Sequence, residues 1–165
     1  MKKKRVVIIS LLLLLVSVIG ISSYFLFKDK INLLDVDHSA VDWNGKKQKD
    51  TSGEENTIAI PGFEKVTLYA NETTQAVNFH NPEINDCYFK ISLIHPDGSV
   101  LWISDLIEPG KGMYSIELEK TLAVGEYENA VLKYECFSLN DQSPLNGSEI
   151  NLKISCRLDK GGNFL

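Results

Sequence analysis

The residue types that most often do chemistry are scattered in this chain of 165 residues. Its histidines, His38, His80 and His95, are dispersed, and none lies in a spacing typical of a zinc protease. The sequence has no Cys-x-x-Cys pair, no Gly-x-Ser-x-Gly motif and no glycine-rich phosphate loop. Acids such as Glu117 and Glu119 are close in sequence, but glycoside hydrolysis needs two carboxyl groups across a cleft. We therefore predict no catalytic residue and no cofactor, and expect that the protein is not an enzyme.

Two segments contain enough oxygen atoms to suggest a metal ion. Asp35, Asp37 and His38 lie close together, but nothing nearby in sequence completes a shell of four to six ligands. The segment 139–148 is rich in side-chain oxygens and could hold calcium, although a tight connection between strands would use the same residues for turns. We expect solvated charges in the first segment and turns in the second, and we predict no metal site.

The three cysteines, Cys87, Cys136 and Cys156, leave at least one thiol unpaired. Each falls on the apolar side of an alternating pattern, so all three should point into a core. If the strands carrying Cys87 and Cys136 are antiparallel neighbours, the start of one lies beside the end of the other. The sequence therefore predicts Cys87 and Cys136 as a candidate disulfide, with Cys156 remote from both. The alternative is three small buried residues with inert thiols.

The elements that must position these residues are short strands, because apolar and polar residues alternate from Thr57 onward. We expect strands at 58–60, 65–70, 75–79, 87–93, 99–104, 113–118, 127–137 and 150–158. Tyr127 has the opposite parity to Ala130, which predicts a β-bulge near residues 128–129. Trp102 is expected in the core. The pattern predicts an all-β fold, an immunoglobulin-like two-sheet antiparallel sandwich of seven to eight strands.

The N-terminus resembles a membrane-targeting segment. Residues 1–5 form a basic tip of charge +4, and residues 6–27 contain no charge at all. About 20 apolar residues cross a bilayer as a helix, and a basic tip before them favours a cytoplasmic N-terminus. We predict a single transmembrane signal-anchor helix at 6–27 with the remaining chain outside the cell. The alternative is a cleaved signal peptide, which would leave a secreted protein.

The residues after this span divide by composition. Residues 28–56 are polar and lack periodicity, so we expect a flexible stalk in which Trp43 is a local packing anchor. Residues 57–160 should form the sandwich domain and 161–165 a disordered tail. The net charge of −5 combines the basic tip with −7 over residues 57–165. Such an acidic domain is repelled by a phosphate backbone, so no nucleic-acid partner is expected.

Several strings of the sequence resemble a group of small Gram-positive surface proteins that join a basic tip, one span and a β-sandwich. The strings are Ile58–Gly62, Asn81–Phe89, Ser104–Gly110, Leu122–Tyr127 and Ser143–Gly147. The resemblance implies an exported bacterial protein and carries over no site residue. Some of those proteins bear the name tRNA uracil-5-methyltransferase, which does not fit this chain. It has no βαβ pattern with a glycine-rich cofactor loop, and an acidic domain outside the cell has no access to tRNA.

These observations predict a membrane-tethered extracytoplasmic module of the binding or adhesion type, which displays a sandwich to another protein or a cell-envelope polymer. Loops present binding surfaces most often, and we expect contacts at 81–86, 106–111 and 140–147. The candidate contact residues in these loops are Asn85, Asp86, Glu108, Lys111, Asp141 and Asn146. One alternative is a carbohydrate- or calcium-binding accessory domain, and a more remote one is a small cell-envelope enzyme.

Overall fold

The computed structural model describes residues 33–45 and 57–158. They form eight strands: β1 (Val41–Asp42), β2 (Lys65–Tyr69), β3 (Thr74–His80), β4 (Cys87–Ile94), β5 (Val100–Ile103), β6 (Lys111–Glu117), β7 (Gly125–Ser138) and β8 (Pro144–Arg157). The predicted basic tip, the span at 6–27 with its alternative cleavage, and the tail at 161–165 lie outside the described residues. Within the two described ranges, no helix is long and apolar enough to cross a membrane.

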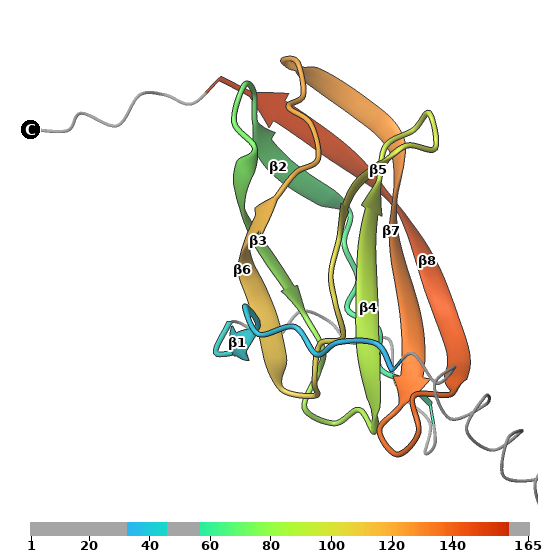
Figure 1. Cartoon of the computed structure of the whole chain (residues 1–165). Helices are drawn as coiled ribbons and strands as arrows, with labels where there is room; N and C mark the ends of the chain where they lie inside the picture. Colours follow the sequence, from blue (N-terminus) through green and yellow to red (C-terminus); the bar gives the residue numbers. More distant parts are fainter. Residues whose placement is uncertain (1–32, 46–56, 159–165) are drawn as a thin grey trace, which may run out of the picture. The chain divides into compact units, whose positions relative to one another are not determined.

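The strands form two sheets, which confirms the prediction of an all-β, two-sheet fold (Figure 1). The larger sheet has the order β2-β8-β7-β4-β5, and the smaller has the order β1-β6-β3. Paired strands are antiparallel except for β2 and β8, which run parallel. The strand of Cys87 and the strand of Cys136 are the antiparallel neighbours expected from the sequence.

The core lies between the sheets and follows the period-two pattern. Phe79 of β3 is fully buried and stacks against Trp102 of β5, with ring centroids 5.8 Å apart. Phe89 of β4 meets Tyr134 of β7 edge to face at 5.3 Å. Trp102 is therefore a core residue, as predicted. Alternation of this kind puts every second side chain on one face, where burying it stabilises the fold.

The bulge predicted near residues 128–129 is confirmed. The pairing of β7 with β8 shifts register between Tyr127 and Ala130. Asn129 has a φ of 62°, a left-handed conformation that asparagine adopts more readily than most residues. The extra residue turns the half-buried Tyr127 to the same side as Ala130, so its ring packs against the core.

Residues 34–45, which we name the strap, correct the predicted domain boundary at residue 57. We expected a flexible stalk over 28–56, but β1 pairs with β6 and Val36 forms a parallel bridge to Leu106. The strap begins beside the β7–β8 connection, where Gln142 exchanges two hydrogen bonds with the backbone of Leu34 (2.6 and 3.0 Å). The sandwich therefore includes a segment that carries no strand-like alternation.

The segment 58–60, which we expected to be a strand, is not one. It is held by a side chain instead: the Asn85 amide accepts a hydrogen bond from Ala59 N (2.7 Å) and donates one to Ala59 O (2.9 Å). A bidentate amide replaces the pairing that a neighbouring strand would have supplied.

Candidate functional site

The three predicted contact loops lie at the same end of the sandwich (Figure 1). We name the loop end as the strap together with residues 81–86, 104–111 and 139–143. Two of its loops are joined by backbone hydrogen bonds, from Asn81 N to Lys111 O and from Gly110 N to Asn81 O, each of 2.9 Å. The third loop is reached through Leu34 of the strap and Gln142. Segments far apart in sequence are therefore held as one surface.

Two buried asparagines brace this surface. Asn81 is fully buried, and its amide donates to Cys87 O (2.8 Å) and Ile107 O (2.9 Å). The amide of Asn85 donates to Asn81 Oδ1 at 2.8 Å. Asn85 is only 7% exposed, so this predicted contact residue is a structural residue instead. Its asparagine type suits the role because one side chain supplies both a donor and an acceptor to buried backbone.

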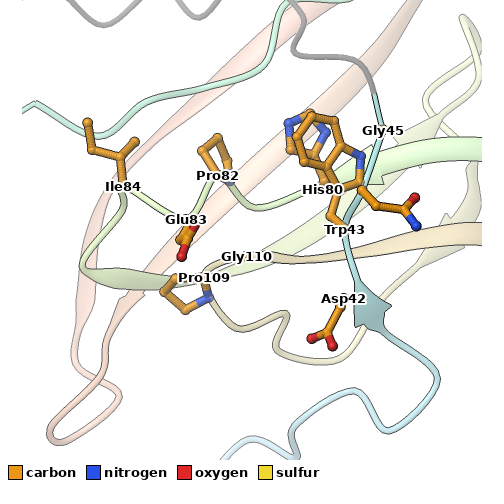
Figure 2. A pocket seen from close by; sticks show the side chains of 10 residues that line it. Asp42, Trp43, Gly45, His80, Pro82, Glu83, Ile84, Pro109 and Gly110 are labelled. Atoms are coloured by element: carbon orange, nitrogen blue, oxygen red, sulfur yellow. The ribbon is translucent and has the colours of Figure 1, made fainter.

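A pocket of about 780 Å³ opens between the strap and the first two loops (Figure 2). Its lining consists of Asp42, Trp43, Asn44, Gly45, His80, Pro82, Glu83, Ile84, Pro109 and Gly110. Apolar and proline side chains therefore meet two carboxylates in one concavity. Its volume lies within the range that ligand pockets commonly have.

Trp43 holds the strap side of this pocket. Its ring stacks on His80 with centroids 3.8 Å apart and planes at 8° (Figure 2). The indole Nε1 donates to Asn78 Oδ1 at 2.8 Å. Gly112 of β6 permits this approach, because a Cβ there would lie 2.9 Å from Trp43 Cδ1 and from Phe79 O. Trp43 is thus the packing anchor that its sequence context suggested, and it is also a wall of the pocket.

The loop end is acidic, and two of its carboxylates, Asp42 and Glu83, line the pocket. The loop end holds one lysine, Lys111, against eight carboxylates: Asp35, Asp37, Asp42, Glu83, Asp86, Asp105, Glu108 and Asp141. Lys111 pairs with Asp42 at 2.5 Å, and this hydrogen bond and charge lower the pKa of Asp42. Glu83 has no ion pair with any residue that the structure describes.

The remaining predicted contact residues do not line the pocket. Asp86, Glu108 and Asn146 are exposed, and Lys111 is occupied by Asp42. Asp141 accepts a hydrogen bond from Ser143 N (3.1 Å), and hydrogen bonds from Ser143 lower the pKa of its carboxyl group. It therefore shapes the β7–β8 turn, as the turn interpretation expected, but this turn ends at Ser143. The second part of the predicted loop, including Asn146, belongs to β8 because it pairs with β7.

The predicted contact loops 81–86 and 106–111 contribute residues to the pocket, but none of the six predicted contact residues lines it. Ile84 is 77% exposed, and an isoleucine within the polar run 81–86 was a signal that we did not use. Trp43 was dismissed as a contact residue because it fell in the supposed stalk. Among the described residues, no group of three or more His, Cys, Asp or Glu side chains could hold a metal ion.

The three cysteines are buried free thiols. Cys87 is opposite Ser138 and Cys136 is opposite Phe89, so the pair is diagonal across β4 and β7. A hydrogen bond between the thiols lowers the pKa of Cys87, and the same bond together with burial raises the pKa of Cys136. Cys156 lies at the other end of β8, where its thiol faces Leu122 O. Cys87 and Cys136 are therefore neighbouring thiols, and the disulfide between them stays a prediction.

No family model, curated protein or solved structure matches the chain. The fold and the loop end are therefore the basis for a function.

Proposed function

We propose that the protein is a membrane-tethered extracytoplasmic binding module with an immunoglobulin-like sandwich. Support for the immunoglobulin-like assignment comes from the antiparallel run β8-β7-β4 in one sheet and the pairing of β3 with β6 in the other. Support for the tether comes from the basic tip and the uncharged stretch 6–27. The partner is another protein or a cell-envelope polymer.

The observation that carries this proposal is the pocket at the loop end. Two loops and the strap converge on it, and the buried amides of Asn81 and Asn85 hold these segments in place. Aromatic, proline and exposed aliphatic groups next to charged ones are typical of recognition surfaces. A rigid sandwich that braces its loops in this way is suited to presenting a preformed surface.

Carbohydrate binding, the alternative function, would need different side chains in the pocket. A sugar needs an open aromatic face on which to stack. The half-buried Trp43 ring already stacks on His80 with one of its faces. The wall of the pocket opposite the strap is made of Pro82, Glu83 and Ile84 (Figure 2). These groups favour a protein partner over a glycan.

Site-specific photo-crosslinking on intact cells tests the proposal. A photoreactive amino acid replaces Ile84 in the pocket, and in a matched control it replaces Val124, which is 58% exposed at the other end of the sandwich. We expect position 84, and not position 124, to capture one distinct protein. Saturable glycan adducts at position 84 would favour the carbohydrate-binding alternative. Identical adducts at both positions would contradict a binding surface at the loop end.

A further inference from the structure

We infer that the loop-end pocket binds a basic peptide segment of a partner protein, with an apolar side chain of that segment seated between Trp43, Pro82 and Ile84. This inference rests on the proposed function and adds the chemistry of the partner to it.

The apolar part of the pocket sets the first requirement. Ile84 is 77% exposed, which leaves a large aliphatic side chain uncovered at the rim. Pro82 and Pro109 continue the apolar lining, and Gly110 closes it beside Glu83 (Figure 2). A volume of about 780 Å³ holds one or two side chains of a peptide together with its backbone. The occupant therefore presents at least one apolar side chain.

The charge around the pocket sets the second requirement. The loop end has eight carboxylates against one lysine, a net charge of −7. The rest of the described sandwich has nine carboxylates against six basic residues, a net charge of −3. Acidity is thus concentrated where the pocket lies, and opposite charge on the partner steers association and selects against acidic partners. Glu83, next to Ile84, offers a carboxylate that has no ion pair with any described residue.

A single metal ion does not match this distribution. The carboxylates of the described residues are spread over several segments and include no group of three that could bind a metal. An anionic lipid headgroup does not match either, because like charges repel. An extended chain with several positive charges and an apolar side chain satisfies both requirements, and a basic peptide supplies both groups on adjacent residues.

Peptide binding by the full-length protein in zwitterionic lipid nanodiscs tests this inference, with empty nanodiscs as the blank. The probe is a fluorescein-labelled hexapeptide, Gly-Lys-Leu-Lys-Lys-Gly. We expect saturable binding that weakens at least fivefold between 50 and 500 mM salt, about the loss expected when a few exposed charge pairs are screened. A peptide with glutamate for lysine should not bind, and one with serine for leucine should bind about fivefold more weakly.

Exposed side chains allow variants that leave the core untouched. We expect Ile84→Ser to weaken binding about fivefold and Glu83→Lys about tenfold. The matched controls, Val124→Ser and Glu72→Lys, change exposed residues outside the pocket and should stay within twofold. Equal binding of the glutamate peptide, or unchanged binding by both pocket variants, would overturn the inference.

Two further outcomes distinguish a basic partner segment from the chain's own lysines and from a partner of different chemistry. Residues 46–49 follow the pocket residue Gly45 and include three lysines. If the hexapeptide binds only after Lys46, Lys47 and Lys49 are replaced by serine, the chain's own segment is the occupant and the inference of a partner is overturned. If no peptide binds but crosslinking at position 84 still captures one protein, the proposed function stands and the basic-peptide inference fails.

Discussion

The two ends of the sandwich are closed in different ways. The turn end, residues 70–73, 95–99 and 118–124, combines a local turn, in which His95 N donates to Ser99 O (2.9 Å), with backbone bonds between its loops, such as Leu118 N to Thr73 O (2.9 Å). The loop end is joined by long-range bonds, of which Leu34 N to Gln142 Oε1 spans 108 residues. Backbone bonds join distant segments at both ends, whereas at the loop end the buried amides of Asn81 and Asn85 and the strap also hold such segments around a pocket.

This difference explains why the buried polar groups of the loop end matter. Loops are usually the least ordered parts of a sandwich, and a binding surface made from them needs support. Asn81 and Asn85 provide it from within, and the strap provides it from outside. Changes at the loop end should therefore have larger effects than matched changes at the turn end.

The largest effect is expected for Asn81→Ala. This change leaves the buried carbonyl of Cys87 without its side-chain donor, which costs about 1–3 kcal/mol. It also removes the bonds of Asn81 to Asn85 and to Ile107 O, although Ile107 O keeps its bond from Phe89 N (3.0 Å). We expect a loss of about 4 kcal/mol in the free energy of unfolding, measured by urea denaturation. The turn-end control Asn71→Ala places alanine at a φ of 64° and should cost about 1 kcal/mol. Equal losses would contradict the contrast between the ends.

Formation of a disulfide between Cys87 and Cys136 should also stabilise the loop end and not the turn end. Oxidation of the Cys87 and Cys136 thiols by an external disulfide such as oxidised glutathione, which is itself reduced to two thiols, would close a loop of roughly 50 residues and raise the free energy of unfolding by about 3 kcal/mol. Alkylation with and without reductant, followed by mass spectrometry, counts the free thiols. The exported protein should show one free thiol before reduction and three after it, and Cys156→Ser should leave the stabilisation unchanged. Three alkylated thiols without reductant would exclude the disulfide.

A methyl group added at a glycine should be more costly beside the strap than at the turn end. Alanine at position 112 would place Cβ 2.9 Å from both Phe79 O and Trp43 Cδ1, so Trp43 must move. We expect a loss of about 2 kcal/mol from overpacking, together with weaker peptide binding. At the turn end, Gly98 has open space but a φ of 85°, so Gly98→Ala should cost about 1 kcal/mol from backbone strain alone. Thermal unfolding ranks the two variants, and the reverse order would be inconsistent with a tight strap.

The turn end also shows how much a sequence can predict. Alternation and turn residues are local signals, so they located β2 to β8, the buried Trp102 and the bulge at Asn129. The strap has no such signal, because its two-residue strand β1 and its bridge to Leu106 depend on partners far away in sequence. The sequence pattern alone therefore does not distinguish residues 34–45 from a flexible stalk.

The candidate site shows the same limit at the level of single residues. An asparagine in a polar loop resembles a solvated contact residue, so Asn85 was placed on the surface. Its burial depends on Ala59 and Asn81, which the sequence does not place beside it. The positions of the loops 81–86 and 106–111 were predictable because turn residues separate the alternating strands on either side of them, and their contact role stays a prediction. Their convergence with Trp43 on one pocket was not predictable, because it depends on the strap.

The smallest effect concerns acid pH. The pKa of Asp42 is lowered by Lys111, and that of Asp97 is lowered by hydrogen bonds from Ser99 and by His95. A depressed carboxyl pKa gives stability that is present above the unfolded-state pKa and lost as pH falls through the folded-state pKa. Both carboxyl groups are exposed, so each effect is small. Of these two carboxyl groups, Asp42 joins the strap to β6 and Asp97 does not. Acid should therefore loosen the strap before the core unfolds.

Trp43 fluorescence in a Trp102→Phe background follows the strap in this acid titration, because Trp43 is then the only tryptophan. We expect a small transition below pH 4, in the range where an exposed carboxylate takes up its proton. Asp42→Asn should remove that transition, since the side chain of asparagine does not titrate there, while the turn-end control Asp97→Asn should leave it in place. A transition that survives Asp42→Asn, or that disappears with Asp97→Asn, would show that the two ends do not respond to acid independently.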